Sequence, residues 1–323
     1  MQIEEFKKNC EEIVKAIGNI FVGDEPALRK ILCASLVNGH VLFEDYPGLG
    51  KTLLTKIFAK VIGCNWKRIQ FTPDLLPADI IGTRVWLSKK SEFSLEKGPI
   101  FTNVLLADEI NRATPKTQSA LLESMEERQV TIEGTLHRLE SPFFVIATQN
   151  PLEMEGTYPL PEAQIDRFLI KLSLGYVDSI EEETKILKRR IEWKTDDPAE
   201  DIESVVTQKT FKKMQKEVEN SVFVHENILN YITEIVRKTR THSKVEVGAS
   251  PRGGLALLKL SRAMALSRGR DFVTPDDVKD FAYDALTHRI ILTSEQMLEG
   301  VDSEKIVEEA ISEVKAPKEY KPG

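Results

Sequence analysis

A glycine-rich stretch that ends in a lysine and a threonine is the first place where residue types and spacing indicate chemistry. Residues 44–52 read Glu-Asp-Tyr-Pro-Gly-Leu-Gly-Lys-Thr and lie between an apolar run and a helical pattern. Gly48 and Gly50 let backbone N–H groups approach a phosphate, and the N-terminus of the following helix favours negative charge. Lys51 would contact the outer phosphates, and Thr52 would bind magnesium. The alternative is a glycine turn that ends in a surface lysine.

One position of this stretch departs from the phosphate-binding motif. The motif begins with glycine six residues before the lysine, and here Asp45 stands at that place with Glu44 beside it. A carboxylate about 4 Å from a phosphate charge would be repelled by about 4 kcal/mol in a medium of moderate dielectric. Aspartate also suits turn conformations, so its side chain can point away from a ligand. We therefore expect the protein to bind nucleotide, with an affinity that Asp45 lowers.

An acidic pair follows a fully apolar run. The run Val104-Leu105-Leu106-Ala107 fits a strand buried on both faces, and Asp108 and Glu109 come directly after it. Ligands of open parallel sheets bind at the carboxyl ends of the strands. There, Asp108 can hold magnesium and Glu109 can act as the general base on an attacking water. In isolation the pair could also cap the next helix.

A third candidate strand, Phe143–Thr148, ends in Gln149-Asn150-Pro151. The amide of Asn150 can orient a water molecule without competing for a metal ion, although Asn-Pro alone is only a turn signal. Because a lysine cradle, an acidic pair and an amide all follow strands, the sequence predicts one site for MgATP hydrolysis.

Two arginines can stabilise the negative charge that develops during phosphoryl transfer. Arg167 lies in Asp166-Arg167-Phe168, just before the last candidate strand. Arg252 lies in Ser250-Pro251-Arg252, at the start of a helix in the second half, from which it could reach back to the nucleotide. Each could instead be a surface arginine or a partner in a salt bridge.

Apolar periodicity predicts an α/β fold, a parallel sheet flanked by helices, followed by an all-helical lid. The expected strands are 41–44, 67–71, 104–107, 143–148 and 169–174, and the expected helices include an N-terminal one and 25–37, 51–62 and 115–127. Beyond residue 176 no strand is evident, and Ile228, Tyr231, Ile232, Ile235 and Val236 mark one face of a helix. We therefore predict two domains, residues 1–176 and 177–323, and a disordered tail from Lys315.

Composition narrows the classes of protein. The 323 residues carry a net charge of −7, which argues against a protein that grips nucleic acid through overall basicity. No apolar run has the length of a membrane span. Cys10, Cys33 and Cys64 are far apart and fit reduced structural thiols of a cytoplasmic protein.

Together these motifs resemble the MoxR family of AAA+ ATPases, over about residues 18 to 290. The resemblance is carried by the glycine-lysine loop, Leu106–Ala113, Ala147–Pro151, Glu155–Gln164, Asp166–Phe168 and Gly248–Arg252. The stretch Glu155–Arg167 is much more specific to the family than the glycine-lysine loop.

The resemblance implies a role for each matching residue. Lys51 and Thr52 match Walker A, Asp108 and Glu109 match Walker B, and Asn150 matches sensor 1. Arg252 matches sensor 2, and Arg167 matches an arginine finger that acts on the ATP of a neighbouring subunit. The implied nucleotide contacts are Val22 and Gly23 at the adenine, Pro47, Gly48, Leu49, Gly50 and Leu53 along the loop, and Arg252.

The resemblance further implies a ring, usually a hexamer, that remodels or activates partner proteins. Metal or cofactor insertion is typical of the family, often with a partner that carries a von Willebrand factor A domain. The segments Trp86–Ile100 and Arg128–Leu139 resemble inserted loops, which face partners or a pore in related machines or are ordinary surface hairpins. A nucleic-acid motor, a non-hydrolysing nucleotide-gated scaffold and a magnesium-chelatase-like subunit are the alternatives.

Overall fold

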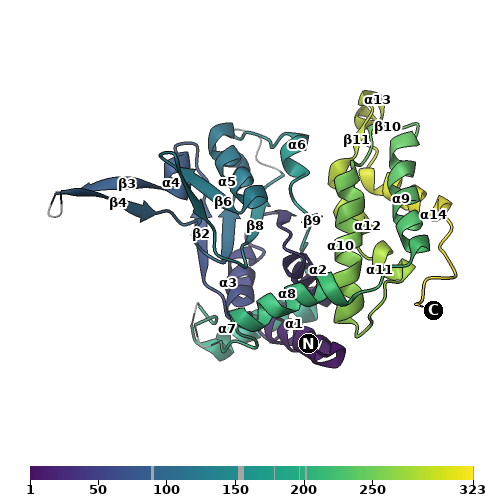
Figure 1. Cartoon of the computed structure of the whole chain (residues 1–323), viewed down its shortest axis with the longest axis horizontal. Helices are drawn as coiled ribbons and strands as arrows, with labels where there is room; N and C mark the ends of the chain where they lie inside the picture. Colours follow the sequence, from purple (N-terminus) through teal and green to yellow (C-terminus); the bar gives the residue numbers. More distant parts are fainter. Residues whose placement is uncertain (89–90, 152–155, 178, 196, 201, 323) are drawn as a thin grey trace.

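The computed structural model describes residues 1–88, 91–151, 156–177, 179–195, 197–200 and 202–322. A five-stranded parallel sheet lies at one end of the molecule, with helices packed on both of its faces (Figure 1). Its strands, in spatial order, are β2 (Trp66–Gln70), β5 (Val104–Asp108), β8 (Phe144–Gln149), β1 (Val41–Glu44) and β9 (Ile170–Leu172). The five strands predicted from the sequence are confirmed to within two residues at each end.

Successive residues of the three central strands, β5, β8 and β1, belong to two separate hydrophobic cores. In β5, Val104 and Leu106 join the first core, whereas Leu105 and Ala107 join the second. Side chains alternate along a strand, so a strand covered on both faces has to be apolar throughout. The helices of this half are α1 (Ile3–Gly18), α2 (Glu25–Leu36), α3 (Lys51–Val61), α4 (Pro77–Ile81), α5 (Pro115–Glu127) and α6 (Glu162–Ile165), with a 3-10 turn η1 (Ile110–Arg112).

The second half is helical, as predicted, except for one short ribbon that sequence analysis missed. Its helices are α7 (Ile180–Trp193), α8 (Gln208–Ser221), α9 (Glu226–Thr241), α10 (Pro251–Ser267), α11 (Pro275–Lys279), α12 (Ala282–Leu286), the 3-10 turn η2 (Thr287–Arg289), α13 (Ser294–Leu298) and α14 (Ser303–Glu313). The ribbon pairs β10 (Val245–Val247) with β11 (Ile291–Leu292). Strands this short carry too few residues for an alternating pattern to be visible in the sequence.

Helix starts in this half follow local side-chain chemistry. The Ser250 hydroxyl accepts a hydrogen bond from the backbone N–H of Arg252, and Pro251 takes the first helical position of α10. Thr274 and Asp277 form a reciprocal capping box at α11. Ser250-Pro251 and Thr274-Pro275 both show the sequence pattern of a capping residue followed by proline at the first helical position. The segment that begins α10 is therefore locally determined, and Arg252 has a fixed place at its first turn.

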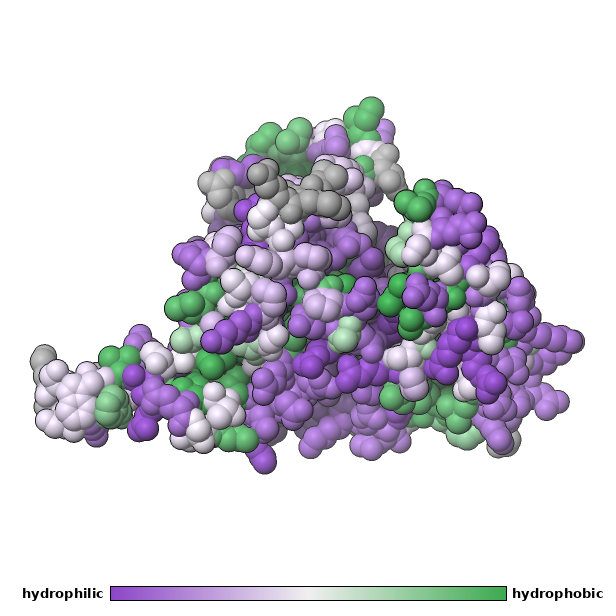
Figure 2. Space-filling model, turned by 90° about the horizontal axis from the view of Figure 1, so that it is seen from above, coloured by the Kyte–Doolittle hydropathy of each residue, from purple (hydrophilic) through white to green (hydrophobic). Residues whose placement is uncertain are grey.

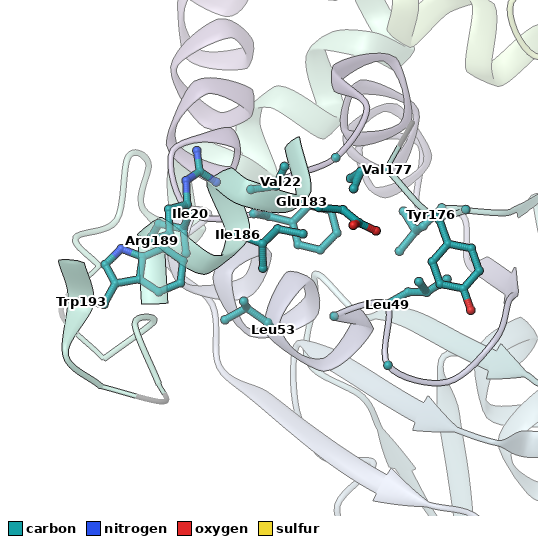
Figure 3. A pocket seen from close by; sticks show the side chains of 16 residues that line it. Ile20, Val22, Leu49, Leu53, Tyr176, Val177, Glu183, Ile186, Arg189 and Trp193 are labelled. Carbon is teal, nitrogen blue, oxygen red and sulfur yellow. The ribbon is translucent and has the colours of Figure 1, made fainter. Parts of the chain in front are cut away.

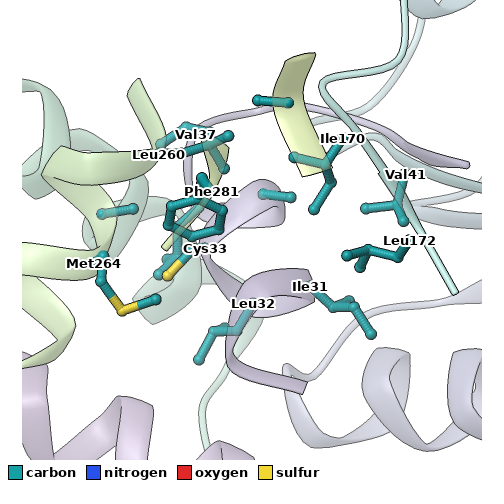
Figure 4. Packing of buried hydrophobic residues seen from close by; sticks show 14 of the residues in the cluster. Ile31, Leu32, Cys33, Val37, Val41, Ile170, Leu172, Leu260, Met264 and Phe281 are labelled. Atoms are coloured by element: carbon teal, nitrogen blue, oxygen red, sulfur yellow. The ribbon is translucent and has the colours of Figure 1, made fainter. Parts of the chain in front are cut away.

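One hydrophobic core continues from the sheet into the helical part. Figure 4 shows the α2 residues Ile31, Leu32 and Cys33 between strand residues on one side and lid residues on the other. The strand side chains are Val41, Ile170 and Leu172, and the lid side chains are Leu260, Met264 and Phe281. Burial raises the pKa of the Cys33 thiol to about 12, so this cysteine is an inert packing residue.

Two hairpins extend from the sheet half. The first pairs β3 (Gly82–Leu87) with β4 (Glu92–Lys97) and protrudes well beyond the body (Figures 1 and 2). Its base requires glycine, because a Cβ on Gly82 would lie 2.2 Å from the carbonyl oxygen of Glu96. The second pairs β6 (Gln129–Ile132) with β7 (Thr135–Arg138), as predicted, through Glu133 and Gly134, which both have positive φ.

The C-terminal tail differs from the prediction of disorder. Tyr320 packs against the core with its ring 6.4 Å from that of Phe272, and Asn227 donates a hydrogen bond to the carbonyl of Glu319. The contacts of this partly buried tyrosine order a tail whose lysine- and proline-rich composition suggested disorder. Among the residues described, no helix has the length and apolarity that crossing a membrane requires.

A buried histidine joins β8 to α5. The Nδ1 atom of His40 accepts a hydrogen bond from the backbone N–H of Val145 at 2.9 Å, and Nε2 donates to the carbonyl of Met125 at 3.2 Å. Burial, followed by the charge of Arg128, holds the pKa of His40 well below its ordinary value. The folded protein therefore keeps this ring neutral at pH values at which the unfolded chain binds a proton.

This difference predicts acid sensitivity. The free energy of unfolding should fall as the pH decreases below about 6.5, by up to about 1.4 kcal/mol per pH unit for each such histidine. Replacing His40 with Gln should remove part of that pH dependence. Urea denaturation at several pH values measures it, with His137→Gln in the β6–β7 hairpin as the control. An unchanged slope in His40→Gln would contradict the assignment.

Candidate functional site

The glycine-rich loop lies where the sequence predicted, between the end of β1 and the start of α3. Gly48 and Gly50 have φ values of 86° and 75°, in the left-handed region that favours glycine. Gly50 precedes Lys51, the first residue of α3, so the backbone N–H groups of the first turn are available to an anion. A Cβ at Gly50 would also lie 3.1 Å from the Phe21 ring. The loop therefore has the shape of a phosphate cradle.

Lys51 is held by the loop itself. Its Nζ atom donates to the carbonyl oxygens of Asp45 at 3.1 Å and Tyr46 at 3.0 Å. Burial lowers the pKa of Lys51, and the charges of Asp45, Asp108 and Glu109 oppose that shift. A phosphate that binds in the cradle would replace the two carbonyls as the acceptor of this ammonium group.

The acidic pair lies at the carboxyl end of β5, the strand that pairs directly with β8. Asp108 accepts a hydrogen bond from the Thr148 hydroxyl at 2.7 Å through Oδ1, and Arg68 pairs with Oδ2 at 2.7 Å. Glu109 accepts from Gln70 Nε2 at 2.6 Å. The Arg112 guanidinium lies 3.0 Å from the same Glu109 oxygen. Both carboxylates are therefore oriented by partners on neighbouring elements.

Sequence reasoning did not identify Arg68, Gln70 and Thr148. A signal was present, since Arg68 and Gln70 are separated by one residue and so project from the same face of β2. Their importance depends on register, because Gln70 pairs directly with Asp108 across the sheet. The sequence does not give the order of strands, so it could not place β2 beside β5.

A cavity of about 450 Å³ brings the predicted residues together. Its lining consists of Asp45, Pro47, Gly48, Leu49, Gly50, Lys51, Thr52, Leu53, Arg68, Gln70, Asp108, Glu109, Thr148, Gln149 and Asn150. The ends of β1, β5 and β8 thus meet at one edge, as expected for a parallel sheet. Thr52 and Asp108 offer hydroxyl and carboxylate oxygens, the donors that magnesium prefers, so the lining fits that ion.

The contacts of Asp45 explain how an aspartate can stand where the phosphate-binding motif has glycine. Its carboxylate is 4% exposed, and it accepts hydrogen bonds from the Ser173 hydroxyl and from the backbone N–H groups of Leu174 and Gly175. These donors belong to the segment after β9, so the carboxylate already has hydrogen-bond partners within the chain. The repulsion considered from the sequence is thereby reduced, because a carboxylate with several donors is partly neutralised.

An apolar slot of about 270 Å³ adjoins the cradle (Figure 3). Val22 and Gly23, the residues expected at the adenine, line it together with Leu49 and Leu53 of the loop and helix. The opposite wall consists of Leu174, Gly175, Tyr176, Val177, Glu183, Ile186, Arg189 and Trp193. A flat heteroaromatic ring suits such a slot, which opens directly beside the phosphate cradle. The wall from the segment after β9 and from α7 was not predicted.

The two candidate arginines lie together, away from both cavities. Arg167 Nη1 is 3.2 Å from Glu126 Oε2, and Arg252 Nη2 is 2.6 Å from Glu126 Oε1. The expectation that Arg252 reaches the nucleotide of its own subunit is therefore not met in this structure. The reason is tertiary: the first turn of α10 faces the C-terminal end of α5 across a small cavity, and Glu126 pairs with the Arg252 guanidinium there.

An ion pair between the buried Arg289 and the partly exposed Asp166 fixes this arrangement. Asp166 accepts from Arg289 Nε at 2.7 Å and from the Ser250 hydroxyl at 3.2 Å. Arg289 also donates to the carbonyl of Phe168 and is only 8% exposed. Since removing Asp166 would leave an uncompensated charge on the buried Arg289, Asp166 and Arg289 hold η2 and α10 against the sheet half.

A parallel sheet in the order 2-5-8-1-9, a glycine-lysine cradle and an acidic pair at the adjacent strand ends define a P-loop nucleotide-binding protein. Comparison with known proteins narrows the class. Residues 40–170 match the family model described as "ATPase family associated with various cellular activities (AAA)", and residues 237–310 match the AAA lid domain.

The chain is similar to its relatives over most of its length. It is 50% identical to YeaC of Bacillus subtilis, an uncharacterized protein, over 94% of this chain and 93% of YeaC. It is 43% identical to Chaperone MoxR1 of Mycobacterium tuberculosis, over 95% of this chain and 82% of that one. A crystal structure of a candidate ATPase from Cytophaga hutchinsonii has a TM-score of 0.90 at 40% identity, covering 98% and 97% of the two chains. The chain belongs to the MoxR family of AAA+ ATPases.

The position of Arg252 predicts the outcome of a binding experiment. Because Arg252 lies outside both cavities and pairs with Glu126, Arg252→Ala should bind a fluorescent ATP analogue within about twofold of wild type when the protein is dilute. Lys51→Ala is the matched control and should lose most of the affinity, since it removes the cation of the cradle. Titration by fluorescence anisotropy measures both. A large loss of affinity in dilute Arg252→Ala would place this arginine at its own nucleotide.

Proposed function

We propose that this protein hydrolyses MgATP within a ring of identical subunits and uses the cycle to remodel or activate partner proteins. The observation that carries the proposal is the single cavity into which the ends of β1, β5 and β8 converge. It brings Lys51 and Thr52, Asp108 and Glu109, and Asn150 together beside an apolar slot.

Each residue of the site has a separate role in this proposal. Lys51 and the N-terminal N–H groups of α3 bind and orient the phosphates, and the slot holds the adenine. Thr52 and Asp108 would hold Mg²⁺, which supplies charge neutralisation to the phosphates. Glu109 accepts a proton from the attacking water, and Asn150 orients that water. Gln70 and Arg112, which contact Glu109, determine where its carboxylate points.

The positive charge for the transition state comes from a second subunit in this proposal. Arg167 and Arg252 lie on the side of the molecule formed by α5 and α10 and do not line the cavity of their own chain. An arginine that acts on a neighbour's ATP generates a head-to-tail contact, which closes into a ring. Resemblance to the family supports a hexamer.

The β3–β4 hairpin supports a role in contacting other proteins. Trp86 and Phe93 are about half exposed, and their ring centroids lie 5.0 Å apart near the ends of β3 and β4 where the hairpin turns. Exposed aromatic side chains on a projecting element are typical of protein-binding surfaces. A relative named as a chaperone supports a remodelling function. A partner with a von Willebrand factor A domain and insertion of a metal or cofactor are further parts of this proposal.

The ATPase rate per subunit tests the shared site. The wild-type rate should rise with protein concentration, because a complete site needs two subunits. Glu109→Gln should lower kcat by about 10²- to 10⁴-fold, as loss of a general base does. Arg167→Ala should lower it by about 10³-fold or more.

Binding of a fluorescent ATP analogue is the control, since both variants should still bind nucleotide. A rate that does not depend on concentration, together with an active Arg167→Ala protein, would contradict the shared site. Mixing Glu109→Gln with Arg167→Ala subunits adds a positive test: the first supplies the arginine, the second supplies the base, and part of the activity should return.

A further inference from the structure

We propose that Asp45 couples the phosphate cradle to the segment entering the lid, so that nucleotide bound to a subunit acts on the lid of that same subunit. This inference rests on the ATP binding proposed above and identifies a route for its signal. It assigns a positioning role to the residue that stands where the motif has glycine.

The Asp45 carboxylate contacts the lid-entry segment, residues 173–177, at several points. It accepts from Ser173 Oγ at 2.6 Å, from the N–H of Leu174 at 2.9 Å and from the N–H of Gly175 at 3.3 Å. Hydrogen bonds to a charged acceptor are strong, and this carboxylate is almost fully shielded from water. Glycine at position 45 could make none of these contacts, so the connection depends on the aspartate side chain.

A second contact joins the same two parts of the chain. The rings of Tyr46 and Tyr176 are stacked, with their centroids 6.1 Å apart at an interplanar angle of 24°. Residues 174–177 also form one wall of the adenine slot, and α7 continues that wall with Ile186 and Trp193 (Figure 3). The lid-entry segment therefore contacts Asp45 on one side and the position of the base on the other.

Lys51 provides the link to phosphate. In this structure its ammonium group donates to the backbone carbonyls of Asp45 and Tyr46. When a phosphate binds Lys51, those two carbonyls lose their donor, so the loop backbone beside the Asp45 side chain keeps the hydrogen bond from its N–H to Gln149 but loses its contacts with the lysine. The change is transmitted through the Asp45 carboxylate, because its partners are the backbone N–H groups of the lid-entry segment.

Arg252 does not connect a subunit's own nucleotide to its lid in this structure. The family resemblance makes Arg252 the lid residue that senses nucleotide, yet here it pairs with Glu126 on the other side of the molecule. Among the lid-half residues described, those that line the two cavities all lie between Val177 and Trp193. The segment that Asp45 holds is therefore the direct path from a subunit's own nucleotide to α7, the first helix of the predicted lid half.

Asp45→Ala tests the proposal in the full-length protein, because it removes the carboxylate without adding the backbone freedom of glycine. Affinities for ADP and for inorganic tripolyphosphate are measured by calorimetry in the presence of magnesium. Hydrogen exchange is followed at residues 45–55, 173–177 and 180–193, with and without ADP. In the wild type, we expect ADP to slow exchange in all three segments.

In Asp45→Ala, we expect tripolyphosphate to bind within about twofold of wild type, because Lys51 and the cradle remain. ADP should bind about tenfold more weakly, since one wall of the adenine slot is no longer held. ADP should still slow exchange in 45–55 and should no longer do so in 173–177 and 180–193. Damage limited to the cradle would weaken both ligands equally.

Three further variants keep the test decisive. Asp45→Asn retains an acceptor for the backbone N–H groups and should restore part of the ADP affinity and of the protection. Ser173→Ala removes one donor and should have a smaller effect of the same kind, so it serves if Asp45→Ala fails to fold. Glu44→Gln removes a carboxylate one residue away that pairs with Lys171 of β9, and it should leave protection of the lid-entry segment unchanged.

The outcomes separate this inference from the proposed function. If wild type binds neither ADP nor tripolyphosphate, the proposed ATPase function fails. If wild type binds ADP and folded Asp45→Ala or Ser173→Ala protein shows wild-type protection of residues 173–177, the coupling role of Asp45 is overturned. The same follows if Asp45→Ala weakens ADP and tripolyphosphate to the same extent.

Discussion

The parallel pairing of β1 with β8 on one side and β9 on the other is the constraint on which the site depends. The carboxyl end of β1 carries the phosphate cradle. The end of β8 carries Asn150, and the end of β9 carries the segment that contacts Asp45. One strand thus places the cradle beside both Asn150 and the segment that contacts Asp45. The burial of Val41, Leu42 and Phe43, which are shielded on both faces of the sheet, holds it there.

The charged groups of the site already have partners in this structure. Asp108 pairs with Arg68, the amide of Gln70 holds Glu109, and the loop carbonyls hold Lys51. Ligand binding is therefore an exchange of partners, and its free energy is the difference between two sets of interactions. Groups of this kind are positioned before substrate arrives, which reduces the entropy lost on binding. The same exchange lets phosphate binding change the contacts of the protein.

The two proposals assign different sides of the subunit to different tasks. The side with the adenine slot senses the subunit's own nucleotide and passes the change through Asp45 to α7. The side with Glu126 presents Arg167 and Arg252 to a neighbour. Because Asp166 and Arg289 fix α10 and η2 to the sheet half, movement of the lid would also move the arginine side. A head-to-tail ring could then pass the state of one site to the next.

The sequence by itself determined the features that depend on local order. The five strands, the caps at Ser250 and Thr274, and the loop from Gly48 to Thr52 follow from patterns within a few residues. The sequence also placed Lys51, Asp108 and Asn150 at strand ends, where parallel strands must converge. Only the tertiary structure decided which strands are neighbours, so it alone revealed Arg68 and Gln70 beside the acidic pair.

The conformation of Asp45 and the location of Arg252 were likewise decided by the tertiary structure. The contacts of Asp45 come from residues 173–175, and the partner of Arg252 is Glu126, which lies 126 residues earlier. Local patterns carry no information about contacts at such separations, because packing of whole elements creates them. The sequence therefore predicted which residues converge at the strand ends, and tertiary packing determined that α7 lines the apolar slot and that Arg252 lines neither cavity.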